Sequence, residues 1–303
     1  MQEASFIEYI RSLSDFDPAV VPVGPGDDMA VVRCGGQDLL VAADQVLDGV
    51  HFRLAEHGAR AAGRKAMARN LSDVAAMAAE PLAAVATVVL PKGFSESDAK
   101  EIYAGLRELG DAFACPLVGG DVGTWDGAMT ISLTILARPG AGGVVLRSGA
   151  RVGDAICVTG ALGAAWHTTR HLTFTPRVAE ARILAGQYGP RAMIDLSDGL
   201  SVDLAHLCDA SGVGADVHAP AVPIHPDARN RPDPLASALG DGEDYELLFT
   251  LPQDQAERLL ADKPLEGVAV TQIGTIVAAP ARTLILADGR RVALAATGWQ
   301  HNT

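Results

Sequence analysis

Val-Gly-Pro-Gly-Asp-Asp-Met-Ala-Val-Val, residues 23–32, joins a glycine-rich turn to two adjacent carboxylates and the start of an apolar strand. Gly24 and Gly26 flank a proline, and such residues allow the backbone to turn tightly. Asp27 and Asp28 follow without a basic neighbour, so their charges repel unless solvent or a cation lies between them. The stretch therefore predicts a turn that presents two acids to a cation.

Further aspartates follow apolar, strand-like runs or lie among small residues. They are Asp44, Asp73, Asp121 and Asp198. Each alone is most simply a turn or cap residue. Asp73 has the further alternative of a salt bridge with Arg69, four residues earlier on an expected helix. Together these acids, several of them expected at strand ends, predict one cation-filled pocket built from separate segments.

Phosphate-binding loops of the common kinds are missing from the sequence. There is no Gly-x-x-x-x-Gly-Lys-Ser/Thr, and no Gly-x-Gly-x-x-Gly in the context of a dinucleotide site. A triphosphate needs positive charge around it, and Mg²⁺ held by carboxylates is the other common source. No Ser-His-Asp or Cys-His pairing can be argued from spacing. The sequence therefore favours a Mg²⁺-dependent phosphate site.

Composition narrows the class of protein. The chain has 303 residues, a length that suits two domains. Its net charge of -13 argues against a nucleic-acid partner, which needs a basic face. The four cysteines form no Cys-x-x-Cys pair, which argues against zinc. Without a basic leader or an apolar run of membrane-spanning length, we expect a cytoplasmic protein with no membrane partner.

The periodicity predicts an α/β (α+β) chain. Helices are expected at 3–13, 59–79, 95–113, 176–188 and 200–210, with one more ending near 260. Strands are expected at 29–33, 38–43, 82–90, 116–120, 129–137, 155–159, 191–195, 212–218, 245–250, 268–277 and 283–287. Residues 219–234, with five prolines, are expected to form a surface loop. The glycine-rich run 139–143 predicts a boundary between domains 1–140 and 141–303.

Segments along nearly the whole chain resemble the thiamine-monophosphate kinase family. They are 24–28, Asp44 with 48–52, 70–77, 119–121, 147–150, 195–200 and 242–249. Their order along the chain is also that of the family. The resemblance implies the fold of the aminoimidazole-ribonucleotide synthetase (PurM-like) superfamily. In that fold an N-terminal mixed sheet pairs in a homodimer, and a C-terminal α/β domain follows.

The resemblance also implies a reaction, the transfer of the γ-phosphoryl group of ATP to thiamine monophosphate. The predicted Mg²⁺ ligands are Asp27, Asp28, Asp44, Asp73, Asp121, Asp195 and Asp198. The residues implied for ATP are Tyr103, Gly120, Arg147 and Ser197. Those implied for thiamine monophosphate are His51, Glu243 and Trp299. The acceptor phosphate is already ionised at neutral pH, so no catalytic base is expected.

Some of these residues have simpler interpretations. His51 would be an exposed loop histidine, Arg147 would bond a carbonyl group, and Trp299 would pack on the core. The chain also departs from the family pattern. Ala42 and Ala43 replace hydroxyl residues, 161–175 is short, and Asp241 replaces a glycine. These departures leave open an alternative, a non-catalytic or differently specific ATP-binding dimer of the same fold.

Overall fold

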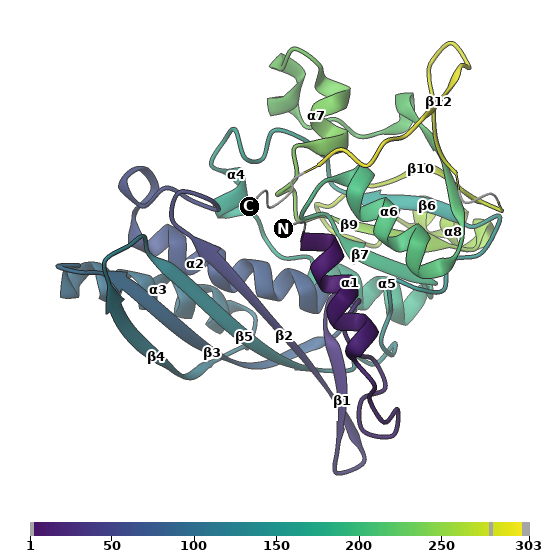
Figure 1. The fold of residues 1–303 in the computed structure, drawn as a ribbon. Coiled ribbons are helices and arrows are strands. Elements are labelled where there is room, and N and C mark those ends of the chain that lie inside the picture. The colour runs from purple at the N-terminus through teal and green to yellow at the C-terminus, as the bar shows by residue number, and fades with distance from the viewer. Residues whose placement is uncertain (1–2, 279–280, 299–303) are drawn as a thin grey trace.

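The computed structural model describes residues 3–278 and 281–298, which form two mixed sheets with α2 between them (Figure 1). The first part comprises α1 (Glu3–Leu13), β1 (Ala30–Cys34), β2 (Gln37–Leu47), α2 (Leu54–Ala76), β3 (Glu80–Pro91), α3 (Glu96–Ala112), β4 (Leu117–Trp125) and β5 (Thr130–Arg138). The second comprises β6 (Ala155–Thr159), α4 (Arg170–Thr173), α5 (Val178–Gln187), β7 (Ala192–Asp195), α6 (Leu200–Ser211), β8 (Gly214–His218), the short 3-10 helices η1 (Ala219–Ala221) and η2 (Pro226–Asn230), α7 (Pro234–Gly240), β9 (Leu247–Leu251), α8 (Gln253–Asp262), β10 (Val270–Val277), β11 (Arg282–Ile285) and β12 (Arg291–Ala293).

The first sheet has the order β1-β2-β5-β3-β4 and is mixed, as predicted, because β3 and β4 are parallel while the other neighbours are antiparallel. Two of its strands are longer than the sequence predicted. β2 pairs with β5 up to Leu47, and β4 pairs with β3 up to Trp125. Asp44 and Asp121 therefore lie within strands, and their expected position at strand ends is wrong. Pairing with neighbours outweighs the poor strand propensity of aspartate.

The second sheet has the order β12-β11-β8-β10-β6-β9-β7, with β8 and β11 parallel and the other pairs antiparallel. The proline-rich segment 219–234 contains η1 and η2 rather than a plain loop. Helix α7 was not predicted, although its start carries a local signal. Asp233 Oδ1 accepts a hydrogen bond from Ala236 N over 3.0 Å, and Pro234 occupies the first turn.

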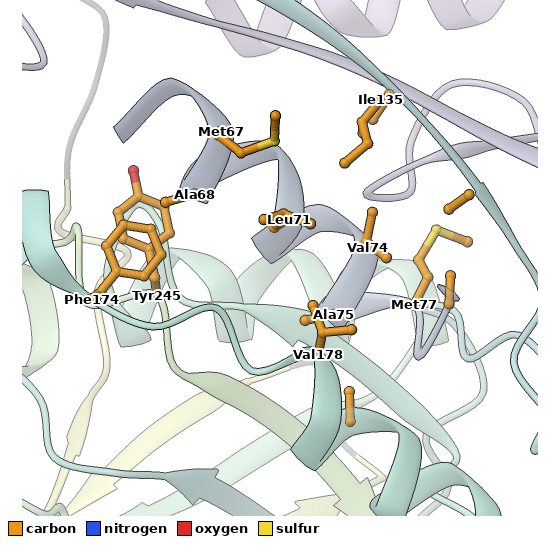
Figure 2. Packing of buried hydrophobic residues seen from close by; sticks show 14 of the residues in the cluster. Met67, Ala68, Leu71, Val74, Ala75, Met77, Ile135, Phe174, Val178 and Tyr245 are labelled. Atoms are coloured by element: carbon orange, nitrogen blue, oxygen red, sulfur yellow. The ribbon is translucent and has the colours of Figure 1, made fainter. Parts of the chain in front are cut away.

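One hydrophobic core joins the two sheets through α2 (Figure 2). Leu71 on α2 is fully buried in the same cluster as Ile135 of β5. On the side of the second sheet, Phe174 stacks on Tyr245 with 4.1 Å between ring centroids and 11° between planes. Arg64 adds polar ties, because its guanidinium donates to the carbonyl oxygens of Leu172 and Phe174 over 2.6 and 2.7 Å. The boundary at 140 stays a prediction, since the two halves share this core.

Helix α2 is the element that positions the site, and its bounds differ from the predicted 59–79. It begins at Leu54 and is interrupted at Gly58, whose φ of 78° is outside the helical region. The predicted start thus coincides with the interruption. The helix ends at Ala76 because Ala78 adopts a φ of 52°. By contrast, the predicted cap of α3 is confirmed, since Ser95 Oγ accepts from Asp98 N over 3.0 Å.

Several apolar side chains and one thiol lie at the surface of the described residues. The apolar side chains of α1 (Phe6, Ile7, Ile10 and Leu13) are exposed rather than packed. All four cysteines are free, and Cys34, at the β1–β2 hairpin, is the exposed one. Burial raises the pKa of Cys157 to about 12. Among the described residues, no helix is both long and apolar enough to cross a membrane.

Candidate functional site

A cavity of about 250 Å³ lies where β2, α2 and the end of β7 meet. We call it the acid pocket. Its lining residues are Asp28, Ala42, Ala43, Asp44, Arg69, Asp73, Asp195, Ser197 and Tyr245. Four predicted metal ligands and the predicted ATP residue Ser197 are thus brought together from segments far apart in the chain.

Three carboxylates form the centre of the acid pocket. Oxygens of Asp28, Asp73 and Asp195 all lie within 4.8 Å of one another. Burial, together with the neighbouring acids, raises the pKa of Asp73 well above its ordinary value and that of Asp195 to about 7. Acids held this close need a cation to be ionised together. The set fits Mg²⁺, which prefers carboxylate oxygens and completes its shell with water and phosphate.

The turn of residues 27–28 is tied to the second half of the chain by Arg147. Both carboxylate oxygens of Asp27 accept from Arg147 N over 3.2 Å. The Arg147 guanidinium donates to Asp28 through Nη2 over 2.7 Å and through Nε over 3.1 Å. Burial and the charge of Asp28 raise the pKa of Asp27 to about 6. Arg147 therefore holds the acidic turn, which the simpler carbonyl interpretation did not predict.

The two acids around the β7–α6 turn are also held by specific partners. Ser72 Oγ donates to Asp195 Oδ2 over 2.5 Å, which connects α2 to the end of β7. Asp198 lies in the turn itself. Its main-chain N and that of Gly199 donate to Asp203 Oδ2 over 3.2 and 3.0 Å. Sequence reasoning missed Asp203, although an acid in the first turn of a helix is a usual partner for such N–H groups.

Arg69 forms an ion pair with Asp44, and not with Asp73 as the alternative interpretation of the sequence predicted. Arg69 Nε lies 2.6 Å from Asp44 Oδ2, and Nη2 donates to Oδ1 over 3.2 Å. No Arg69–Asp73 ion pair forms among the described residues, so that alternative is wrong. Arg69 was not predicted as a site residue. Its position four residues before Asp73, on the same helix face, was the available signal.

A second cluster surrounds Lys65, which lies about one helical turn before Arg69 on α2. The Lys65 side chain is fully buried, and its Nζ contacts the main-chain O of His51 at 2.5 Å and Nδ1 of His171 at 2.8 Å. It also forms an ion pair with Glu243 Oε2. His51 is only 4% exposed, so the interpretation as an exposed loop histidine is wrong. Two residues predicted for the thiamine phosphate, His51 and Glu243, therefore share one buried lysine.

The charges of this second cluster are strongly coupled. Burial alone would raise the pKa of Glu243, but a hydrogen bond with His171 and the charge of Lys65 lower it to about 2. Burial lowers the pKa of Lys65 to about 8 in spite of the opposing charge of Glu243. The backbone is strained here, with φ values of 60° at Glu243 and 51° at Tyr245. Such strain is typical of a segment whose side chains must be held in one direction.

Other predicted residues lie elsewhere. Gly120 lies in register with Asp44 across the first sheet, but strands β5 and β3 lie between the two residues. Three spacings between neighbouring strands place the main chains of Gly120 and Asp44 about 14 Å apart. Asp121 on the edge strand β4 and Tyr103 on α3 are exposed and do not line the acid pocket. Trp299 lies outside the described residues. The assignments of these residues stay predictions.

Comparisons with known proteins connect this geometry to a family. The domain family described as AIR synthase related protein, N-terminal domain, matches residues 26–138, and its C-terminal counterpart matches residues 167–287. A thiamine-monophosphate kinase from Rhodopirellula baltica is 39% identical over 291 residues, which cover 91% of this chain and 89% of the relative. The chain belongs to the thiamine-monophosphate kinase family.

Solved structures of thiamine-monophosphate kinases have the same two-part fold. The enzyme from Stenotrophomonas maltophilia aligns with a TM-score of 0.76 and 31% identity, over 95% of this chain and 96% of that one. A structure described as AaThiL complexed with AMPPCP and TMP aligns with a TM-score of 0.83 and 27% identity, over 99% and 97% of the two chains. The PurM-like α/β fold predicted from the sequence is confirmed.

Proposed function

We propose that this chain transfers the γ-phosphoryl group of ATP to thiamine monophosphate, giving thiamine diphosphate and ADP. The observation that carries the proposal is the acid pocket, in a chain of this family. Three carboxylates from separate segments converge there beside Ser197. Charge-stabilised phosphoryl transfer needs such a site, because the protein mainly positions and neutralises its substrates.

The metal ligands proposed are the acids predicted from the sequence, with Asp28, Asp73 and Asp195 forming the centre. Bound Mg²⁺ would supply the positive charge that lets two anionic phosphates approach each other. The protein orients its own carboxylates for this purpose. Arg147 fixes the turn that carries Asp28, and Ser72 fixes Asp195.

The acceptor end of the site is proposed at Lys65. This residue ties the His51 loop to Glu243, so two of the three residues predicted for thiamine monophosphate are held by one ammonium group. An oxygen of the acceptor phosphate attacks the γ-phosphorus. Because that oxygen is already ionised at neutral pH, no residue has to remove a proton. Positioning of the two phosphates in line is therefore the main contribution of the chain.

A homodimer is part of the proposal. The face of the first sheet that points away from α2, together with its edge strand β4, is what we call the open face. Val118 and Val122 on β4 are 63% and 68% exposed, and Val85 on β3 is 42% exposed. A second copy covering this apolar surface would bury it, as the family resemblance implies. The paired copy would then supply Tyr103, Gly120 and Asp121.

The test uses purified protein with ATP, Mg²⁺ and thiamine monophosphate, and measures thiamine diphosphate by chromatography. We expect product with this acceptor and none with unphosphorylated thiamine, which lacks the attacking phosphate oxygen. ATP binding without turnover would contradict the proposal and favour the non-catalytic or differently specific ATP-binding dimer. A cytoplasmic setting is also proposed, on the free state of all four cysteines.

A further inference from the structure

Three polar residues follow one another on a single face of α2. Lys65, Arg69 and Asp73 are spaced four residues apart, so they lie on successive turns, about 6 Å from one to the next. Lys65 contacts Glu243 at the proposed acceptor end, and Asp73 belongs to the carboxylate centre. Arg69 therefore lies between the acceptor and the metal ligands, where the phosphoryl group would pass.

The Arg69 guanidinium is incompletely paired. Nη2 donates to Asp44 Oδ1 over 3.2 Å. Nε lies 2.6 Å from Asp44 Oδ2, but its N–H does not point along a hydrogen bond. Nη1 is shielded from solvent and has no hydrogen-bond acceptor anywhere in residues 3–278 and 281–298. A buried N–H without an acceptor is unfavourable, so a guanidinium in this state indicates that a ligand supplies the missing oxygen.

The surroundings of Arg69 favour a phosphoryl oxygen as that acceptor. Ala42 and Ala43 line the same pocket and carry no side-chain oxygen. Two other cations close to the site are already engaged, since Arg147 is paired through two nitrogens with Asp28, and Lys65 is paired with Glu243. Arg69 keeps a free donor, and a guanidinium matches the geometry of phosphate oxygens.

We propose that Arg69 is a catalytic residue whose Nη1 donates a hydrogen bond to an oxygen of the phosphoryl group in transfer; this inference rests on the proposed function. In the step, an oxygen of the acceptor phosphate forms a bond to the γ-phosphorus of ATP. The bond from that phosphorus to the β,γ-bridging oxygen breaks, and its electron pair leaves with ADP. A fixed positive group beside the transferring oxygens stabilises the charge that they carry.

The experiment compares Arg69→Met, Arg69→Lys and the native chain in steady-state assays with ATP, Mg²⁺ and thiamine monophosphate. Arg60→Met is the matched control, because Arg60 lies on the same helix but pairs with exposed Glu108 on α3. We expect Arg69→Met to lower kcat about 100-fold, with each KM changing less than about threefold. Arg69→Lys keeps a charge beside Asp44 but lacks the forked donor, so we expect a loss of about tenfold. Arg60→Met is expected to match the native chain.

Binding supplies a readout that does not depend on turnover. In calorimetry without metal, Arg69→Met is expected to weaken binding of thiamine diphosphate, which carries the transferred group, by about tenfold, while Arg60→Met leaves it unchanged. Native kcat and native product binding in Arg69→Lys, or in a folded Arg69→Met, would overturn the inference alone. Arg69→Lys decides the question if Arg69→Met does not fold. No thiamine diphosphate from the native chain would overturn the proposed function, and this inference with it.

Discussion

The acid pocket and the open face of the first sheet carry unequal parts of one predicted ligand set, because four of the seven predicted aspartates line the pocket and Asp121 alone lies on the open face. In the pocket, Asp28, Asp73 and Asp195 come from segments more than forty residues apart, and the shared core around α2 brings them together. On the open face, Asp121 lies on an exposed edge strand, several strands away from Asp44. The difference shows that folding of one chain gathers part of the predicted ligand set. Under the proposed homodimer, Asp121 would reach the acid pocket of the second copy.

The sharpest test of this comparison mixes two inactive variants. Asp73→Asn and Asp121→Asn are each expected to lower kcat about 1,000-fold without unfolding the protein, because each removes one proposed metal ligand. If Asp121 completes the pocket of the partner copy, mixed dimers contain one intact pocket and one doubly altered pocket. Refolding the variants together should then restore about a quarter of the native activity, since about half of the dimers are mixed.

Asp126→Asn serves as the control, because Asp126 is an exposed acid directly after β4 whose ion-pair partner among the described residues is Lys92. Its kcat should match that of the native chain. If co-refolded Asp73→Asn and Asp121→Asn stay inactive although mixed dimers form, both acids act within one chain, and the comparison fails. Native activity in either single variant would remove that residue from the ligand set.

The next largest expected effect is on the free energy of unfolding, which depends on pH through Glu243 at the proposed acceptor end. The pKa of Glu243 is lowered from 4.5 to about 2, so its ionised form stabilises the fold above pH 4.5 and the contribution is lost as the pH falls towards 2. Glu243→Gln removes this contribution and leaves Lys65 buried without a counter-charge. We expect a cost of about 3 kcal/mol at pH 6 that shrinks at pH 3. Urea unfolding at the two pH values measures it.

Glu266→Gln is the matched control, because Glu266 is exposed and belongs to neither the acid pocket nor the cluster around Lys65. Its unfolding free energy should differ little from the native value at both pH values. A cost of Glu243→Gln that stays constant from pH 6 to pH 3 would contradict the assigned coupling between Glu243 and Lys65.

The smallest effect tests a local contact outside both regions. Ser95→Ala removes the cap of α3, whose exposed side carries Tyr103. We expect a loss of about 1 kcal/mol in the free energy of unfolding and an unchanged kcat, because the α3 backbone stays in place through its packing on α2. Urea unfolding and the standard assay check both values. A large loss of activity would contradict this expectation and show that the cap of α3 also positions Tyr103.

Local signals in the sequence predicted some features of the fold and of the site, but they could not predict features that depend on residues far apart in the chain. The Ser95 cap depends on neighbours within one turn, and it was predicted correctly. The convergence of Asp28, Asp73 and Asp195 agrees with the prediction from scattered acid-rich segments and family order. The burial of Lys65 and Arg69 could not be predicted, because charged residues on a helix face normally meet solvent. Lys65 is enclosed by His171 and Glu243, more than one hundred residues away.

The exposed thiol at the β1–β2 hairpin allows site-specific labelling for spectroscopy. Cys34 lies on the edge strand opposite β4, and the other three thiols are buried. A maleimide dye should therefore attach once per chain, at a place that leaves the open face free. Two dyes in one particle exchange excitation energy, so the loss of fluorescence polarisation would count copies directly in dilute solution.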